Sequence, residues 1–288
     1  MSLLPSRRPA PATLGTRWPL LFDDAAIFPP GNLPLPEAVR AHQQHRSSWY
    51  ADLVGPLVLS PSALTQIGRL VTSPIDVAVT VPSPDAAATV LADEFPGIRI
   101  VALEVAVPDD FRVGAVVPAV DAALSELGGT RRALGGDPTV YVEVPRDARR
   151  DALIEELAGT SYRAKLRTGG VSADLYPGDA ELARAVHALV LADVPFKATA
   201  GLHHALRNTD PETGFEQHGF VNLLAATAAA TDGADTDELA VLLAARQVRH
   251  LPEPPTTCLL GSIGTCSIAE PIDELMALGL LSAEQVTP

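Results

Sequence analysis

The feature that most constrains the fold of this chain is a repeated unit, in which a short apolar run is followed by a turn and then by a helical stretch. Clear examples of the run are residues 55–60, 75–81, 98–107 and 139–145. These runs are rich in β-branched residues and almost continuously apolar, which is typical of parallel strands covered by helices. The repeat therefore predicts an α/β fold built on a parallel sheet.

The number of units favours a closed barrel. Residues 19–24 form the first apolar run, and two later runs contain Lys165 and Lys197, so seven strand candidates alternate with helices. Helical periodicity is clearest just after Gly178, where Leu182, Val186 and Leu189 recur on one face. The prediction is a (β/α)8 TIM barrel, and an open doubly wound sheet is the alternative.

The eighth strand is the least certain part of this pattern. Residues 219–224 run directly into an alanine-rich stretch and are predicted as helix, as are residues 236–246, for which Asp235 or Thr236 is the expected N-cap. We therefore expect strand eight at residues 257–263 and a closing helix at 270–281. This places an extended helical insertion between strands 7 and 8.

The chain is long enough for one large domain, because its 288 residues and 30.1 kDa include 47% hydrophobic residues. α/β barrels commonly run to this length undivided. Residues 1–18 are interrupted by Pro5, Pro9 and Pro11 and are expected to be a flexible lead-in rather than a signal peptide. Residues 19–288 are expected to form a single barrel domain.

Charge and cysteine content exclude several classes of partner. A formal charge of −14 argues against binding to nucleic acids or anionic membranes, which requires a basic face. Two late cysteines form neither a disulfide framework nor a metal-binding spacing, and no run of about 20 apolar residues is present. We expect a cytoplasmic protein without a cofactor, acting on a small molecule. A homo-oligomeric assembly is left open.

The use of lysine is unusual. Lys165 and Lys197 are the only lysines, since the other nineteen of the 21 basic side chains are arginine. Each lies late in a short apolar run and shortly before a glycine. Arginine cannot lose its proton in a protein, whereas a lysine amine can become neutral and nucleophilic. Our hypothesis is that both positions need an amine.

Strand geometry predicts what surrounds these lysines. In a barrel of this kind the C-terminal strand ends face the active site, and alternate residues point into the lumen. Buried charges need partners, so a purely structural ion-pair network is the alternative to a functional site. The side chains expected to share the lumen are Glu104, Tyr141, Glu143, Lys165, Arg167, Lys197 and Thr199.

Three motifs carry a resemblance to a known family. Residues 165–169 read Lys-Leu-Arg-Thr-Gly, residues 197–201 read Lys-Ala-Thr-Ala-Gly, and residues 264–267 read Gly-Thr-Cys-Ser. These are similar to the K-x-x-T-G, K-A-S-G-G-like and G-T-S-S-like motifs of the class I (Schiff-base) deoxyribose-phosphate aldolases. Glu104 and Glu143 resemble the acids on strands four and five of that family.

The resemblance implies a mechanism. Lys165 would form an imine with a carbonyl substrate, and Lys197 would lower the pKa of Lys165 by like-charge proximity and relay protons. Glu104 would be the general acid/base, with Glu143 as a second catalytic carboxylate. The other motif residues expected to bind substrate are Thr168, Thr199, Gly201, Gly264 and Ser267.

Three departures from the family concern the substrate. Arg167 replaces a small hydroxyl-bearing residue and suggests a carboxylate or phosphate held by a bidentate contact. Cys266 stands where the family has serine in its phosphate loop. The stretch 202–255 is also much longer than the family's equivalent connection, and such a segment is commonly a lid or specificity element.

Further polar residues are expected near the mouth of the barrel. His203 and His204 follow Gly201 directly and are expected to contact substrate, with His203 a candidate acid or base. Asp23 and Asp24 end the first strand and are either a paired-carboxylate site or a turn cap. The histidines predicted to lie on the surface are His42, His45, His187 and His250.

A metal centre is the competing interpretation of these residues. It would combine His203 or His204 with His218 and with Asp23 or Asp24. Adjacent histidines rarely point the same way, and the sequence lacks H-x-x-x-H and C-x-x-C spacings, so no metal is predicted.

The sequence thus favours an aldolase- or lyase-type enzyme acting on a small carbonyl compound, with or without an anionic group, through a Schiff base at Lys165. The alternatives are a metal-assisted barrel lyase or isomerase, and a catalytically inert barrel that binds an acidic metabolite.

Overall fold

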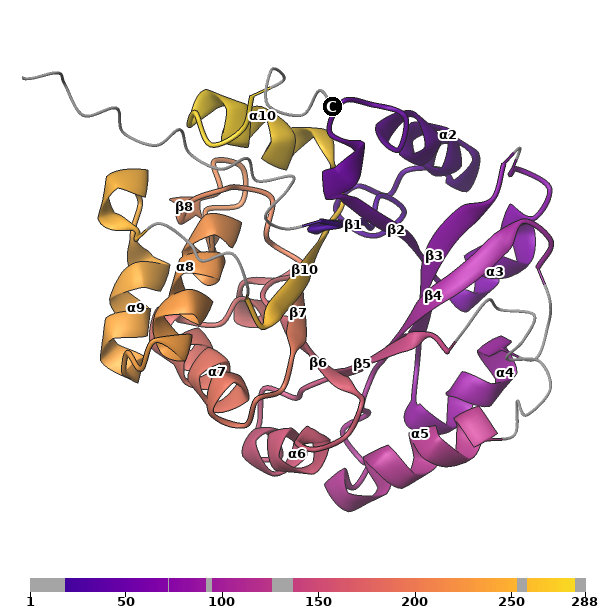
Figure 1. Cartoon of the computed structure of the whole chain (residues 1–288), viewed down its shortest axis with the longest axis horizontal. Helices are drawn as coiled ribbons and strands as arrows, with labels where there is room; N and C mark the ends of the chain where they lie inside the picture. The colour runs from indigo at the N-terminus through magenta and orange to yellow at the C-terminus, as the bar shows by residue number, and fades with distance from the viewer. Residues whose placement is uncertain (1–18, 72, 92–94, 126–136, 253–257, 283–288) are drawn as a thin grey trace, which may run out of the picture.

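A computed structural model describes residues 19–71, 73–91, 95–125, 137–252 and 258–282. Within these residues eight parallel strands close into a barrel with helices around the outside, so the predicted (β/α)8 barrel is confirmed and the open sheet is wrong (Figure 1). The predicted lead-in, residues 1–18, lies outside the described part. The barrel strands, in order around the barrel, are β1 (Phe22–Asp24), β2 (Val54–Leu59), β3 (Ile75–Val81), β4 (Ile98–Val105), β5 (Thr139–Glu143), β6 (Arg163–Arg167), β7 (Phe196–Thr199) and β10 (Leu260–Thr265).

The helices begin where local chemistry predicts. Ser60 caps α3 by accepting a hydrogen bond from the Ala63 amide at 3.2 Å, and Asp235 caps α9 in a capping box with Glu238. The α-helices are α2 (Leu35–His45), α3 (Pro61–Ile67), α4 (Ala87–Leu91), α5 (Val116–Ser125), α6 (Arg150–Leu157), α7 (Asp179–Leu191), α8 (Phe220–Thr231), α9 (Thr236–Ala244) and α10 (Ala269–Ala277). Single 3-10 turns are η1 (Ala51–Leu53), η2 (Pro84–Ala86), η3 (Val113–Ala115), η5 (Ala173–Leu175) and η6 (Val248–His250).

The eighth strand forms close to its predicted position. It is β10, expected at residues 257–263, of which Thr257 lies outside the described residues. Residues 219–224 belong largely to α8, as predicted, and the closing helix is α10. Between β7 and β10 the chain inserts α8, α9 and a small antiparallel hairpin of β8 (Asn208–Thr209) and β9 (Glu216–Gln217). The predicted helical insertion is therefore present, with a hairpin that the sequence did not indicate.

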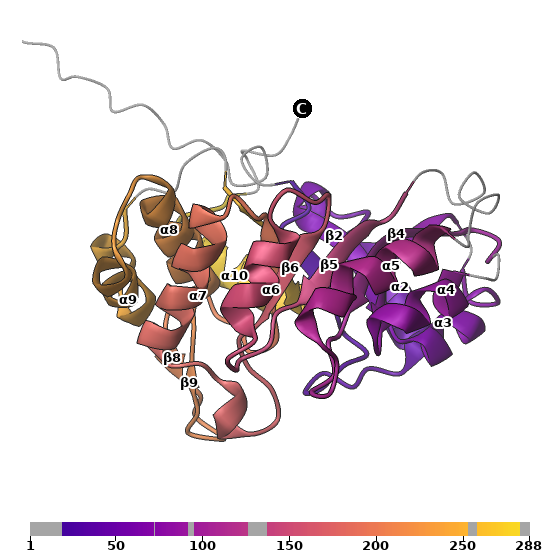
Figure 2. The same cartoon turned by 90° about the horizontal axis from the view of Figure 1, so that it is seen from below.

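Strand register brings the two lysines to one level. Lys165 of β6 is paired with Lys197 of β7 on one side and with Glu143 of β5 on the other. Lys197 is in turn paired with Ser262 of β10. Because neighbouring parallel strands carry paired residues at equal height, these side chains lie in one layer of the lumen. In Figure 2 the β8–β9 hairpin projects below the barrel, at the end where β7 finishes.

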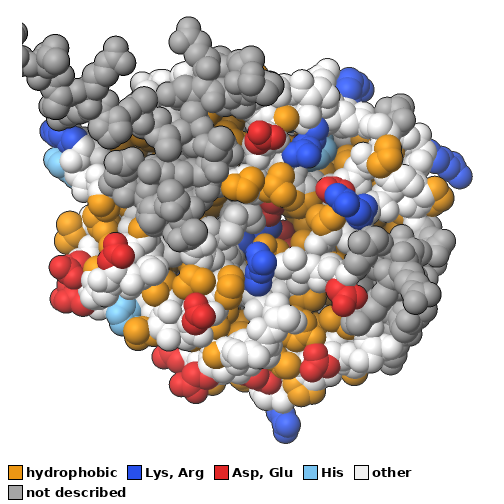
Figure 3. Space-filling model, in the orientation of Figure 1, with side chains coloured by type: hydrophobic (Ala, Val, Ile, Leu, Met, Phe, Trp, Pro, Cys, Tyr) orange, Lys and Arg blue, Asp and Glu red, His pale blue; other side chains and the backbone are white. Residues whose placement is uncertain are grey.

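The face seen along the barrel axis in Figure 3 has acidic and basic side chains scattered singly among apolar ones. Charged side chains of both signs also lie at the central hollow of this face. Among the described helices, none combines the length and apolar character that crossing a bilayer requires.

Candidate active site

Among the described residues, six charged side chains meet inside the barrel, and we call them the lumen network. They come from β1, β4, β5, β6 and β7, and carboxylates alternate with cations along their contacts. With three groups of each sign ionised, the network is neutral as a whole. In order of contact its members are Asp23, Lys197, Glu104, Lys165, Glu143 and Arg167.

Glu104 is the centre of this network. Its Oε1 accepts a hydrogen bond from Lys197 Nζ at 2.6 Å, and its Oε2 lies 2.8 Å from Lys165 Nζ. Lys165 Nζ is also 3.0 Å from Glu143 Oε2, and Lys197 Nζ donates to Asp23. One carboxylate therefore bridges the two amines, so a change in the charge of either lysine is felt by the other.

Asp23 is held in place by two residues that the sequence did not single out. Ser262 Oγ donates to Asp23 Oδ2 at 2.9 Å. Gly55 on β2 leaves space for the carboxylate, because a Cβ there would lie 2.2 Å from Asp23 Oδ1. Ser262 has the same strand parity as Gly264, so alternation along strand eight could have identified it.

The ring of Tyr141 lies beneath the lumen network and fills the barrel there. Lys197 Nζ lies 5.2 Å from the centroid of the Tyr141 ring, and the guanidinium carbon of Arg163 lies 5.8 Å from it. Both distances allow cation–π attraction. Tyr141 packs with Val58, Ala78 and Ala102, so this part of the barrel is filled and is not a pore.

Above the network, a cavity of about 210 Å³ opens at the C-terminal strand ends. Lys165 and Glu104 line it, whereas Lys197 is completely buried below them. The other polar residues on its wall are Thr80, Arg167, Thr199, His203 and Cys266. A ligand in the cavity therefore meets the Lys165 amine and not the Lys197 amine.

The electrostatics of the two lysines differ from our expectation. Burial by itself would lower the pKa of Lys165, but Glu104 and Glu143 outweigh it, and the pKa is raised. Lys197 does lower the pKa of Lys165 by like-charge proximity, as expected, but the intervening carboxylates more than compensate for it, so the net shift is upward. At rest Lys165 is an ammonium ion.

The carboxylates of the network divide into two kinds. Burial opposes ionisation of Glu104, but the two lysines overcome it and hold its pKa at about 2. The pKa of Glu143 is also lowered, because Lys165 and Arg167 outweigh the opposing effect of burial. For Asp23 burial prevails over its attraction to Lys197, so its pKa is raised. Asp23 is thus the member that most readily accepts a proton.

Arg167 reaches the cavity wall but already has a partner. Its Nε donates to Glu143 Oε1 at 3.0 Å and its Nη2 to Glu143 Oε2 at 3.4 Å, with 39% of the side chain exposed. The bidentate contact predicted for a substrate anion is made with Glu143.

Several predicted substrate-binding residues shape the site without lining the cavity. The Thr168 hydroxyl donates to Ala200 O at 2.7 Å and ties the end of β6 to the end of β7. Gly201 has φ of 71°, and a Cβ there would lie 2.6 Å from Tyr176 Cε1, so only glycine fits. Ser267 accepts a hydrogen bond from the Glu270 amide. Of the two glycines predicted to bind substrate, Gly264 does line the cavity.

Asp23 and Asp24 are adjacent in the sequence, but their side chains point to different places. Asp24 points away from Asp23, accepting hydrogen bonds from His42 at 3.0 Å and from the Ala26 amide at 3.2 Å. His42 is 1% exposed, so its predicted surface position is wrong. It lies on the inner side of α2, where the buried carboxylate of Asp24 is its partner.

The two adjacent histidines also separate. His203 lines the cavity. His204 does not line it and is hydrogen-bonded to Glu274 of α10. His218, in the insertion, donates to Pro177 O, just before α7, at 2.7 Å. The residues of the metal alternative are thus not brought together, and within the described residues no three His, Cys, Asp or Glu side chains form a group suited to a metal ion.

Cys266 and Glu270 belong to the cavity mouth and were not predicted as site residues. Cys266 Sγ lies 3.5 Å from His203 Nδ1, and Glu270 Oε2 lies 3.6 Å from the same nitrogen. Burial raises the pKa of Cys266 to about 11, and burial lowers that of His203, so thiol and imidazole are both neutral at pH 7. No sequence pattern links residues 63 positions apart in this way.

The functional interpretation rests on this geometry and on the motifs at residues 165–169 and 197–201. No protein-family model matches the chain, and no curated protein matches its sequence.

Proposed function

We propose that this protein is an aldolase- or lyase-type enzyme that forms an imine between Lys165 and a small carbonyl compound. The observation that carries the proposal is the position of the Lys165 amine. It lines the cavity and lies within 3.0 Å of two carboxylates, whereas Lys197 is sealed beneath it. An amine placed in this way is available to a ligand and has groups beside it that can move protons.

The charge pattern of the lumen network supports an imine. Glu104 and Glu143 are arranged to stabilise a positive charge on the nitrogen of Lys165. A protonated imine has its positive charge at that nitrogen, as the resting ammonium ion does. The network is therefore preorganised for the iminium ion, which is the electron sink that carbon–carbon cleavage requires.

The ammonium ion must lose a proton before it can attack. When Lys165 is neutral, Glu104 still has Lys197 and Glu143 still has Arg167, so neither carboxylate is left unpaired. The amine then adds to the carbonyl carbon, and the carbonyl oxygen leaves as water after protonation. The hydroxyl group on the β carbon then loses its proton and the bond between the α and β carbons breaks, so that its electron pair passes to the iminium to give an enamine and the β carbon leaves as an aldehyde. The enamine is protonated at the α carbon, and water hydrolyses the imine to release the second product and Lys165. We assign the proton transfers to Glu104 and Glu143.

Borohydride trapping tests the proposal. The protein is incubated with a panel of short aldehydes and ketones, reduced, digested and mapped by mass spectrometry. We expect a reduced adduct on Lys165 and none on the matched Lys165→Arg variant, which retains the positive charge but cannot form an imine. Absence of any adduct across the panel would refute the imine, and an adduct on Lys197 would reverse the assigned roles.

One observation favours a second candidate, a barrel that binds a metabolite without catalysis. All six charges of the lumen network are paired, and the pKa of Lys165 is raised, as in a structural ion network. The same trapping experiment separates the two candidates, because a structural lysine that stays protonated yields no reduced adduct.

A further inference from the structure

We infer that the carbonyl compound carries no phosphate or carboxylate group, and that it is a small uncharged hydroxy-aldehyde or hydroxy-ketone. The inference rests on the proposed function and specifies its substrate class. It follows from three features of the cavity. These are the ion pairs that its cations already make, the hydrogen bonds within the turn between β10 and α10, and the negative charge at its mouth.

The cations on the cavity wall are already neutralised. Within the described residues that line the cavity, these are Lys165 and Arg167, and each lies within 3.0 Å of a carboxylate oxygen. An anionic group on a ligand at Arg167 or Lys165 would lie next to the carboxylates that already pair with these cations. It would add a negative charge beside Glu104 and Glu143, and like charges at short range repel.

The turn between β10 and α10 makes hydrogen bonds within itself. Thr265 Oγ1 donates to Ser267 O at 3.0 Å and accepts from the Ser267 amide at 3.4 Å. Ser267 Oγ in turn accepts from the Glu270 amide at 3.4 Å. Between them stands Cys266, whose thiol is a weak donor directed at His203. The Thr265 hydroxyl, the Ser267 amide and the Glu270 amide are thus already used within the turn.

Negative charge is placed beside this turn. Glu270 lies 3.6 Å from His203, which is on the cavity wall, and it contributes to raising the pKa of Cys266 after burial itself. One turn further along α10, Glu274 accepts a hydrogen bond from the Ala205 amide at 2.6 Å. A phosphate bound at the mouth would meet the Glu270 carboxylate, and like charges at short separations repel.

What the cavity offers instead suits hydroxyl groups. Thr80, Thr199 and the neutral imidazole of His203 are donors and acceptors without charge. Phe28 and Leu175 supply apolar wall. The volume of about 210 Å³ is below the roughly 300–1,000 Å³ of pockets that bind drug-sized ligands. A short polyhydroxy chain with one carbonyl group matches these properties.

Matched probes test the inference. Glyceraldehyde and glyceraldehyde 3-phosphate are each trapped on Lys165 with borohydride, and the rates of adduct formation are compared at equal concentration. We expect the uncharged probe to react at least tenfold faster. A faster reaction of the phosphate ester would overturn the inference and leave the imine intact, whereas no adduct with either probe, or with the wider panel, would overturn both.

A binding measurement makes the test independent of the imine. Titration with inorganic phosphate, followed by calorimetry, should show no binding up to 10 mM if the cavity rejects anions. Saturable binding below 1 mM that is lost on mutation of a cavity residue would contradict the inference.

Substitutions on α10 isolate the electrostatic contribution. Glu270→Gln removes the charge at the mouth and should increase the rate with the phosphate ester about threefold to tenfold relative to the rate with glyceraldehyde. Asp273→Asn, on the exposed side of the same helix, is the matched control and should leave both rates unchanged. An equal ratio of the two rates in Glu270→Gln and the unmodified protein would contradict the inference.

Discussion

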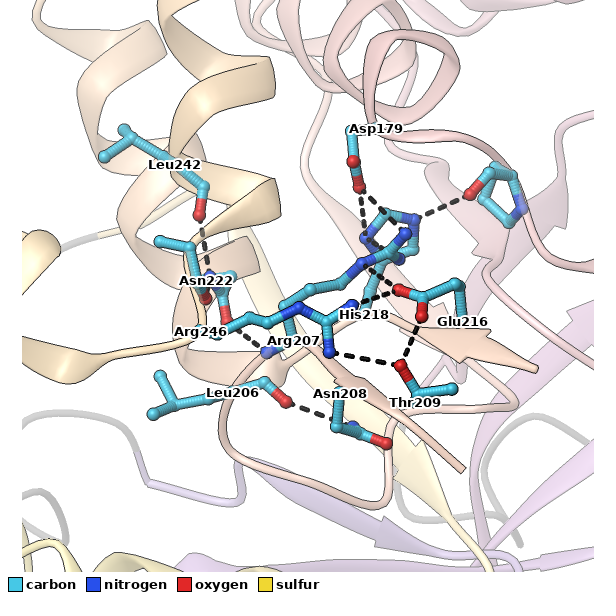
Figure 4. Close-up of polar contacts among 12 residues, drawn as sticks. Asp179, Leu206, Arg207, Asn208, Thr209, Glu216, His218, Asn222, Leu242 and Arg246 are labelled. Carbon is cyan, nitrogen blue, oxygen red and sulfur yellow. Dashed lines mark hydrogen bonds and ion pairs between the residues drawn. The ribbon is translucent and has the colours of Figure 1, made fainter. Parts of the chain in front are cut away.

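Two ion-pair networks in this molecule show how differently the same charges can be used. One is the lumen network, and the other, which we call the insertion cluster, is formed by Asp179, Arg207, Glu216, His218 and Arg246 (Figure 4). Arg207 lies 3.4 Å from Asp179 and 3.3 Å from Glu216, and Arg246 lies 2.5 Å from Glu216. The insertion cluster ties the β8–β9 hairpin to α7 and to the end of α9.

The choice of cation separates the two networks. Both long cations of the insertion cluster are arginine, whose planar fork holds several acceptors at once. The lumen network has lysine at its two central positions and arginine only at its exposed end. The contacts that hold the hairpin use arginine, and the two central positions of the lumen network use lysine. The contrast strengthens the case that the lumen lysines serve chemistry.

Burial separates them further. Side chains of the insertion cluster range from 0% exposed at His218 to 50% at Arg246, with Glu216 at 44%. In the lumen network Asp23, Glu104 and Lys197 are all below 6%. Water can replace a lost partner in the insertion cluster but not in the lumen, so equivalent substitutions should have unequal effects.

The largest difference in stability is expected from removing a central cation. Lys197→Met leaves Asp23 with only Ser262 and deprives Glu104 of one amine, so the free energy of unfolding should fall by about 3–5 kcal/mol. Arg207→Met should lower it by about 1–2 kcal/mol, since Glu216 retains Arg246 and can be hydrated. Urea denaturation of both variants measures the comparison, and equal losses would remove the distinction.

Acid sensitivity gives the next largest effect. The folded pKa of Glu104 is about 2, below its ordinary value of 4.5, so its contribution to stability is present above pH 4.5 and is lost as the pH falls toward 2. The shift corresponds to roughly 3 kcal/mol. The Glu104→Gln variant should be less stable than the unmodified protein at pH 7. On acidification, its free energy of unfolding should fall by roughly 3 kcal/mol less than that of the unmodified protein.

The control for acid sensitivity is a carboxylate in an exposed ion pair. Asp76 lies 2.5 Å from Arg99, with 39% of its side chain exposed. Asp76→Asn should retain the acid dependence of the unmodified protein. If Glu104→Gln and Asp76→Asn had the same profile between pH 5 and pH 2, Glu104 would not be ionised by the lumen lysines as described.

The smallest effect is expected at the outer edge of the insertion cluster. Arg246→Met removes an ion pair in which both side chains are about half exposed, so the free energy of unfolding should fall by at most about 1 kcal/mol, and by less at high salt. Arg246→Lys should be closer still to the unmodified protein. A loss above about 3 kcal/mol would show that the insertion cluster is as critical as the lumen network.

Much of the site could be predicted because strands obey a simple alternation. Residues two apart on a strand point the same way, so Lys165 predicts Arg167, and the apolar runs predict which strands carry Glu104 and Glu143. The barrel follows from the number of strand and helix units. Alternation does not indicate which of two adjacent residues points inward, so Asp23 and Asp24 could not be distinguished until β1 was placed against β2 and β10.

Other parts of the site depend on contacts between distant segments. His42 is buried because α2 packs over the first strand and meets Asp24 there. Cys266 approaches His203 because β10 lies beside β7, and the loops after both strands turn over the same cavity. Neither contact has a periodic or local signal in the sequence.

The sequence by itself determined the barrel, the lysine pair and the strands on which its partners lie, because these depend on periodicity and residue type. Only the tertiary structure decided that Lys165 faces the cavity while Lys197 is buried, and that the pKa of Lys165 rises rather than falls. The physical reason is that electrostatic interactions depend on distance through space. Two carboxylates within 3.0 Å of the Lys165 amine outweigh both its burial and the second lysine beyond them.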